Sequence, residues 1–256
     1  MRPAGKTIRP HFKAVLFISP LFWGLASFTS TAVAQTPGAF TSTGEMTTPR
    51  SGHTATLLHE GKVLIAGGWS ARAQGDSGPP ALASAELYDP DTGLFTRTGD
   101  MTTARYQHAA ILLPNGMVLI AGGAVKKFFV IDSGLASAEL YDPSTRTFTP
   151  TGDMVAATPC ATATLLDNGK VLVAGGVAGP PPYGVQIYDP ATATFTAAGT
   201  YAKFTPDNDS GVCPTATLLT NGKVLVTRPF PNDTELYDPS TGTFTSMGDT
   251  MTGGRD

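Results

Sequence analysis

One hydrophobic and polar pattern occurs four times along the chain: a short alternating stretch, a turn, and an apolar run. The four copies are 54–68 (TATLLHEGKVLIAGG), 109–123 (AAILLPNGMVLIAGG), 161–176 (ATATLLDNGKVLVAGG) and 215–228 (TATLLTNGKVLVTR). A second phrase follows each copy: AELYDPDTGLFT, AELYDPSTRTFT, VQIYDPATATFT and TELYDPSTGTFT. Equivalent leucines are Leu64, Leu119, Leu172 and Leu225, so the repeats are offset by 55, 53 and 53 residues. A fixed period of this length indicates a repeat architecture.

Each repeat predicts four short strands. The first strand (54–58 in repeat 1) leads into a tight turn, which in later repeats is Asn-Gly, a strong signal for a two-residue hairpin. The second strand is almost continuously apolar, which is typical of a strand covered on both faces. The third strand is Glu-Leu-Tyr, and after an Asp-Pro turn the fourth strand is centred on an aromatic residue: Phe95, Phe148, Phe195 and Phe244.

A single four-stranded sheet cannot bury both of its faces, so the sheets must stack on one another as an open array or around an axis. Radial stacking gives a β-propeller. We therefore expect an all-β fold of about four complete blades, at 47–99, 102–152, 155–199 and 201–249. The stubs 38–46 and 250–256 match a fourth strand and the lead-in to a first strand. They favour a truncated larger propeller over a four-bladed ring or an open arc.

The first 34 residues predict a secretory signal peptide. Arg2, Lys6, Arg9 and Lys13 precede an apolar stretch at 14–28, and the small residues 32–34 supply a cleavage site after Ala34. The apolar stretch is too short to span a membrane comfortably, and no later run is long enough. We expect a secreted or periplasmic protein, without stable membrane insertion after cleavage, whose propeller domain occupies 35–256.

Composition excludes several classes of protein. The chain has 29 Gly and 21 Pro, but 41% of its residues are hydrophobic and its formal charge is only −3, which indicates a turn-rich globular protein rather than a disordered one. Removing the four basic residues of the signal peptide would leave a charge of −7. Such a protein has no electrostatic reason to bind nucleic acid.

The repeats resemble the kelch family. The resemblance rests on the glycine pair after the second strand, the Tyr of the third, the aromatic residue of the fourth and a period near 50 residues. The VLIAGG and ELYDP phrases are similar to those of exported bacterial kelch-repeat proteins, and the likeness runs from about Phe40 to the C-terminus. It implies a kelch-type β-propeller like the central domain of galactose oxidase. The chain departs from the family in three ways: Phe replaces the fourth-strand Trp, repeat 4 has Thr227-Arg228 where the glycine pair is missing, and repeat 3 lacks Arg and His before its first strand.

The resemblance also brings two enzymes into consideration. The copper site of galactose oxidase needs several Tyr and His, and the mature chain holds only His53, His59 and His108. No local motif singles out the kelch-type sialic acid mutarotase, and no GxSxG, HExxH, P-loop or dinucleotide fingerprint occurs. We therefore assign no catalytic residue and no cofactor, and favour a non-enzymatic role.

Two cysteines occupy the same position in neighbouring repeats, because Cys160 and Cys213 are 53 residues apart. An exported protein with two cysteines usually pairs them, so one interpretation is a disulfide between adjacent blades. The alternative is that both are small residues filling a repeat position, where Gly52 and Gln107 stand in repeats 1 and 2.

Arg50 with His53, and Arg105 with His108, recur before the first strands. They could bind an anion or a metal, but two histidines without a further ligand do not make a zinc site. The favoured alternative is that Arg caps turn carbonyls and His packs at the strand start. Asp207 and Asp209 suggest calcium, but their Gly arrives too early for an EF-hand loop and no Glu follows. We expect no metal.

The loops between the second and third strands differ most among the repeats, so specificity is expected there. They carry exposed aromatic and cationic residues, which suit a protein or glycan surface, unless the loops are simply unselected. We predict a binding or interaction module that uses this loop face. The alternatives are a sugar-active enzyme, mutarotase- or oxidase-like, with its site at the mouth of a central channel, or an adhesive domain of a longer protein. The loop candidates, besides the residues above, are Trp69, Lys126, Phe128, Tyr183, Arg228 and Phe230.

Overall fold

The computed structural model describes residues 41–70, 80–125, 134–175, 184–202, 213–228 and 233–247. These ranges contain strands, turns and loops and no helix, and none of their elements is a helix that could cross a membrane. The predicted signal peptide (1–34) and the stub 250–256 lie outside the described residues. So do the candidates Lys126, Phe128, Tyr183, Asp207, Asp209 and Phe230.

The described chain forms four antiparallel sheets of four strands, each in simple sequence order, which confirms the predicted all-β, blade-type fold. Blade 1 consists of β1 (Thr54–Leu57), β2 (Val63–Ala66), β3 (Ala85–Asp89) and β4 (Leu94–Arg97). Blade 2 consists of β5 (Ala109–Leu112), β6 (Val118–Ala121), β7 (Ala138–Asp142) and β8 (Thr147–Pro150). Blade 3 consists of β9 (Thr162–Leu165), β10 (Val171–Ala174), β11 (Val185–Asp189) and β12 (Thr194–Ala197). Blade 4 consists of β13 (Thr215–Leu218), β14 (Val224–Arg228), β15 (Asp233–Asp238) and β16 (Thr243–Ser246).

The four strand positions of a blade are called a to d. The a–b turns are 58–62, 113–117, 166–170 and 219–223, and the c–d turns are 90–93, 143–146, 190–193 and 239–242. In the first a–b turn Leu58 N–H donates to Lys62 O over 2.8 Å, and Gly61 takes a positive φ of 84°. The later a–b turns place Gly116, Gly169 and Gly222 in the same backbone region, as the Asn-Gly pattern predicts.

The strand register pairs the same side chains in every blade. The tyrosine of strand c lies opposite the first valine of strand b, as Val63 lies opposite Tyr88. It also lies opposite the phenylalanine of strand d, and the Tyr88 and Phe95 ring centroids are 4.8 Å apart. The other three pairs have centroid distances of 4.7, 4.7 and 4.9 Å. The aromatic residue that the sequence places in each fourth strand therefore packs on the tyrosine of its own blade.

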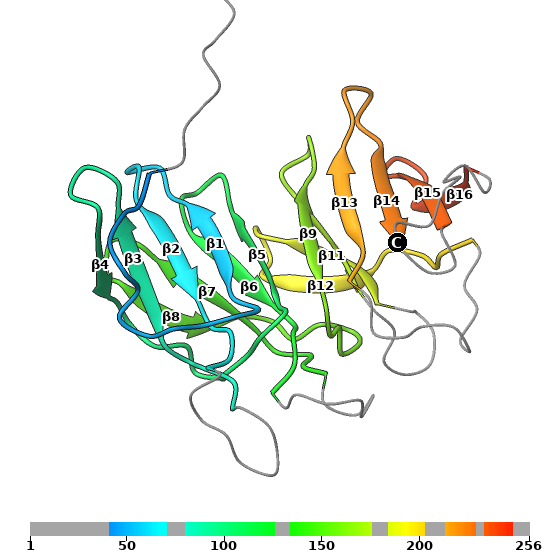
Figure 1. Ribbon diagram of the computed structural model, residues 1–256. Helices are drawn as coiled ribbons and strands as arrows, with labels where there is room; N and C mark the ends of the chain where they lie inside the picture. Colours follow the sequence, from blue (N-terminus) through cyan, green and yellow to red (C-terminus); the bar gives the residue numbers. More distant parts are fainter. Residues whose placement is uncertain are drawn as a thin grey trace, which may run out of the picture. The chain divides into compact units, whose positions relative to one another are not determined.

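The hydrophobic core lies between neighbouring blades. One cluster joins Leu64 and Leu87 of blade 1 to Ile120 and Tyr141 of blade 2, and two further clusters join blade 2 to blade 3 and blade 3 to blade 4. Strands β1, β5, β9 and β13 follow one another from blade to blade (Figure 1). Each sheet buries its apolar strand b against a neighbour, as expected for a sheet that cannot cover two faces alone.

The glycine pairs connect the blades. Gly68 N–H donates to Arg105 O over 2.9 Å, and Gly123 N–H donates to Thr158 O over 3.0 Å, so each pair bonds the segment that leads into the next blade. A Cβ atom on Gly122 would lie 2.5 Å from Thr158 O, and Gly122 has a φ of 68°. Only glycine satisfies both the close approach and the positive φ.

Residues 39–42 match β4 in the repeat alignment, and 39–40 lie outside the described residues, so the predicted N-terminal fourth strand stays a prediction. The described residues 41–46 contain no strand residue, and 43–46 match the segment 98–101, which follows β4. The segment 41–46 contacts blade 1 in the way that the residues after β4 contact blade 2. Gly44 N–H donates to Gly93 O over 3.0 Å, as Gly99 N–H donates to Arg146 O. The sequence match of 38–46 with 93–101 is thus reflected in the same inter-blade hydrogen bond.

Candidate functional site

Arg50 and Arg105, two of the predicted binding residues, are buried in matched networks. Arg50 Nη2 donates to Glu86 Oε1 over 2.6 Å, and Arg105 Nη2 donates to Glu139 Oε1 over 2.8 Å, with all four side chains at most 1% exposed. Arg50 Nη1 also donates to Gly67 O and Ser84 O, over 2.8 and 2.7 Å. The guanidinium groups thus cap backbone carbonyls between strands b and c. These contacts hold strands b and c of the blade together.

The glutamate of each network accepts hydrogen bonds from the segment that precedes strand a. Thr47 N–H and Thr48 N–H donate to the Glu86 carboxylate over 2.7 and 3.1 Å. Burial by itself would raise the pKa of Glu86, but these bonds and the Arg50 guanidinium outweigh it and hold that pKa below its usual value. Sequence reasoning missed this glutamate, although it stands at one position of the strand c phrase in repeats 1, 2 and 4.

Blades 3 and 4 solve the same packing problem differently. In blade 3 both charges are absent, and Gln186 Nε2 donates to Ala156 O and Thr158 Oγ1 over 2.9 and 3.1 Å. In blade 4 Arg228 Nη2 donates to Glu235 Oε1 over 2.9 Å, and its guanidinium carbon lies 4.3 Å from the centre of the Tyr201 ring. Arg228, another predicted binding residue, is therefore engaged within its own blade, with its side chain 13% exposed.

The two histidines come from neighbouring blades. His108 Nε2 shares a hydrogen bond of 2.9 Å with Thr54 Oγ1, and its side chain is buried. Burial, with Arg105 and His53 nearby, lowers the pKa of His108 to about 3. Burial and Arg50 lower the pKa of His53 as well. Within the described part of the chain, Nδ1 of each ring lacks a hydrogen-bond partner, so neutral imidazoles pack at the strand starts.

Cys160 and Cys213 form a disulfide bond, with their Cα atoms 4.8 Å apart. Cys160 has a positive φ of 56°, and Gly52 and Gln107 at the equivalent position have φ values of 65° and 51°. The bridge therefore joins the segments leading into β9 and β13, strands that lie side by side.

The last described loop candidate, Trp69, is half-buried and exchanges backbone hydrogen bonds with Ser51, over 2.8 and 3.0 Å.

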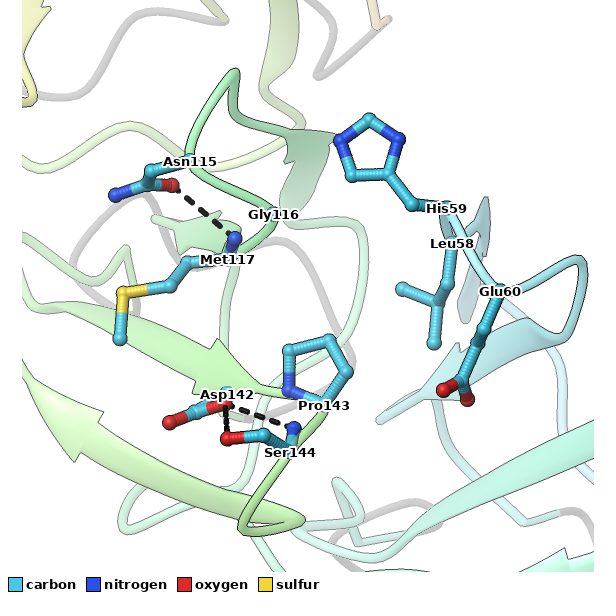
Figure 2. Close-up of a pocket in the computed structure, with 9 residues that line it drawn as sticks. All are labelled: Leu58, His59, Glu60, Asn115, Gly116, Met117, Asp142, Pro143 and Ser144. Carbon is cyan, nitrogen blue, oxygen red and sulfur yellow. Dashed lines mark hydrogen bonds between the residues drawn. The ribbon is translucent and has the colours of Figure 1, made fainter.

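A cavity of about 520 Å³ opens at the turns between blades 1 and 2. The first a–b turn supplies His59 and Glu60, and the second supplies Met117. Asp142, which ends β7, and Pro143, which begins the c–d turn of blade 2, complete this side of the cavity (Figure 2). The other lining residues are Leu58, Asn115, Gly116 and Ser144. The cavity lies at the turn end of the blades rather than at the predicted loops, and sequence reasoning missed it. The signal that could have revealed it is a column of the repeat alignment with Lys62, Met117, Lys170 and Lys223.

No group of three or more His, Cys, Asp or Glu side chains that could hold a metal ion occurs among the described residues. No family model matches the chain, and no curated protein is significantly similar to it.

Proposed function

We propose that this protein is an exported kelch-type β-propeller that acts as a binding or interaction module for a protein or glycan. The ligand would meet the loops that connect strands b and c and the segments that connect one blade to the next. The kelch assignment rests on the repeated VLIAGG and ELYDP phrases together with the four four-stranded blades. Export rests on the basic and apolar stretches that precede Ala34.

The observation that carries the proposal is where the repeats vary in length. Every a–b turn has five residues and every c–d turn has four. The b–c loops, in contrast, cover 67–84, 122–137, 175–184 and 229–232, which are 18, 16, 10 and 4 residues. The connections between blades cover 98–108, 151–161 and 198–214, which are 11, 11 and 17 residues. A rigid scaffold that varies at one end only is the usual design of a recognition surface.

The buried networks support the same division of roles. Arg50 donates hydrogen bonds to Glu86 and to backbone carbonyls, Arg105 does the same with Glu139, and Arg228 is bonded to Glu235. These cations stabilise the ends of the b–c loops, where each loop joins strand b or strand c. Recognition is therefore assigned to side chains farther along those loops, for which the sequence offers Lys126, Phe128 and Tyr183.

Binding is tested with the purified mature protein on a glycan array and against the extracellular protein fraction. Once a ligand is identified, the Lys126→Ala/Phe128→Ala double variant should weaken it at least about tenfold, because aromatic and cationic anchors dominate binding surfaces. The matched control is Leu94→Ala, which removes a side chain that is 59% exposed beside a c–d turn. Loss of binding in the control but not in the loop variant would place the ligand at the a–b and c–d turns and would contradict the proposed loop surface.

Export is tested separately. Expression of the whole chain with a C-terminal tag, followed by cell fractionation and N-terminal sequencing, should give a mature protein that starts at Gln35 and lies outside the cytoplasm. A cytoplasmic protein that retains Met1 would overturn this part of the proposal without affecting the test of binding.

A further inference from the structure

A lysine and an aspartate form an ion pair across the turn end of three blades. The residue before strand b lies opposite the aspartate that ends strand c, because the register pairs Val63 with Tyr88 and the next positions face each other. The Nζ to Oδ2 distances are 3.4 Å for Lys62–Asp89, 2.9 Å for Lys170–Asp189 and 3.0 Å for Lys223–Asp238. The pair is therefore a regular feature of the repeat.

Blade 2 keeps the aspartate and lacks the lysine. Val118 pairs with Tyr141, so Met117 occupies the lysine position opposite Asp142. Oδ1 of Asp142 accepts hydrogen bonds from Ser144 N–H and Ser144 Oγ over 2.8 and 2.7 Å, which lower the pKa of this carboxyl group and keep it charged at neutral pH. In the described ranges no Lys or Arg forms an ion pair with Asp142.

The cavity opens at this same place. Met117 and Pro143 form apolar walls next to the Asp142 carboxylate, and Leu58 adds a third apolar side chain from blade 1 (Figure 2). Glu60 adds a second carboxylate, which Figure 2 shows on the other side of Pro143. Asp142 is half-buried, so it is partly shielded from water and still accessible from the cavity.

We infer that the cavity between the turns of blades 1 and 2 binds a primary alkylammonium group, with the ammonium on Asp142 in place of the missing lysine and the alkyl chain along Met117 and Pro143. A lysine side chain of a polypeptide and a free polyamine share this chemistry. The thioether of Met117 is flexible and apolar, so it can follow an unbranched alkyl chain. The site lies at the opposite end of the blades from the proposed loop surface, so its test does not depend on that proposal.

Binding is measured by NMR titration of the purified mature protein with two probes, Nα-acetyl-lysine methylamide and cadaverine. The matched probe is Nα-acetyl-norleucine methylamide, which keeps the alkyl chain and lacks the ammonium. We expect saturable shifts with the amines and binding of the norleucine probe weaker by up to about fivefold, as the loss of a partly exposed ion pair implies. Tighter binding of the lysine probe than of cadaverine identifies a polypeptide source, and the reverse order identifies a free polyamine.

Two variants of blade 2 and one of blade 3 complete the test. Asp142→Asn keeps the oxygen that accepts the Ser144 bonds and removes the charge, so amine affinity should fall by up to about fivefold. Met117→Lys restores the ion pair of the other blades, so it should occupy the site itself, abolish amine binding and leave the melting temperature no lower than that of the wild type. Asp189→Asn, whose aspartate already has Lys170, should bind the amines like the wild type. No saturable amine binding, or equal binding by wild type, Asp142→Asn and Met117→Lys, would overturn the inference.

Discussion

Arg228 Nη2 donates to Glu235 Oε1 over 2.9 Å, and so serves blade 4 as Arg50 serves blade 1, from a different position in the chain. Arg50 lies four residues before strand a, whereas Arg228 ends β14, at the place where repeat 1 has Gly67. The Arg50 guanidinium itself bonds to the carbonyl of Gly67. Repeat 4 therefore lacks the glycine pair and has an arginine at the Gly67 position, and this cation bonds the strand c glutamate that Arg50 bonds in blade 1.

Separating a buried ion pair should cost far more than separating an exposed one. Arg105→Thr leaves Glu139 buried without its cation, and we expect the free energy of unfolding to fall by about 3–5 kcal/mol. Adding Glu139→Gln copies the uncharged pair of Thr158 and Gln186 in blade 3 and should recover much of that loss. Urea-induced unfolding of the single and double variants measures the coupling.

The control for this pair is Arg97→Ala. Arg97 and Asp100 form an ion pair with side chains 64% and 52% exposed, so the substitution should cost at most about 1 kcal/mol. A double variant no more stable than Arg105→Thr alone would show that the uncharged Thr and Gln pair of blade 3 cannot replace the ion pair in blade 2.

The disulfide between Cys160 and Cys213 should contribute substantially to stability. It closes a loop over a sequence separation of 53 residues, for which the chain-entropy model gives about 4 kcal/mol. The Cys160→Ser/Cys213→Ser double variant should unfold at correspondingly lower denaturant concentration, and a reductant should destabilise the wild type without affecting the variant. The direct check is a thiol count on denatured, unreduced protein, where two free thiols would contradict the bond.

Stability should fall as the pH drops below 6.5, because His108 is buried as a neutral group. Its pKa is about 3 in the folded protein against 6.5 as the ordinary value, so the unfolded state binds the proton more readily between those two pH values. The contribution of the neutral His108 side chain to the free energy of unfolding is complete above pH 6.5. It is lost as the pH falls toward 3, with a slope approaching about 1.4 kcal/mol per pH unit. Chemical unfolding at pH 7.5 and pH 5 measures it.

His108→Asn should reduce this dependence between pH 7.5 and pH 5 and leave the part due to His53, whose pKa is lowered as well, although the variant loses some stability at both pH values. His59→Asn, at an exposed turn position, is the matched control for the loss of a histidine. The window ends at pH 5 because several carboxyl groups, including Glu86, have lowered pKa values and add their own loss at more acidic pH. An unchanged slope in His108→Asn would mean that another group titrates.

The strands could be predicted from the sequence because each one leaves a local signal. The Asn-Gly turns, the apolar run at 63–66 and the Tyr88 and Phe95 pattern all depend on neighbours within one repeat, and four copies reinforce each signal. Equivalence between repeats also placed Cys160 and Cys213 at one position. The N-terminal match extends to a contact as well, because Gly44 N–H makes the inter-blade hydrogen bond to Gly93 O that Gly99 N–H makes to Arg146 O.

The role of individual polar residues could not be predicted in the same way, because it depends on contacts between segments distant in the sequence. Arg50 and Glu86 are 36 residues apart, and the spacing alone does not distinguish a capping arginine from a ligand-binding one. Asp142 is informative only when Met117 is known to lie opposite it, since the same aspartate in blade 3 is paired with Lys170.

The glycine pairs give a last prediction, which separates the effect of backbone conformation from that of inter-blade packing. Gly122→Ala would place a Cβ 2.5 Å from Thr158 O and 3.1 Å from Met154 Cε, at a φ of 68°. Gly61→Ala is the matched control, because Gly61 has a φ of 84° and nothing lies within 4 Å of its added Cβ. The control should cost about 1–2 kcal/mol of unfolding free energy, the usual penalty for a left-handed residue with a side chain. Gly122→Ala should cost clearly more, because blade 3 must move away. Equal losses in urea unfolding would show that the glycine pair is needed only for its backbone conformation and does not set the distance between blades 2 and 3.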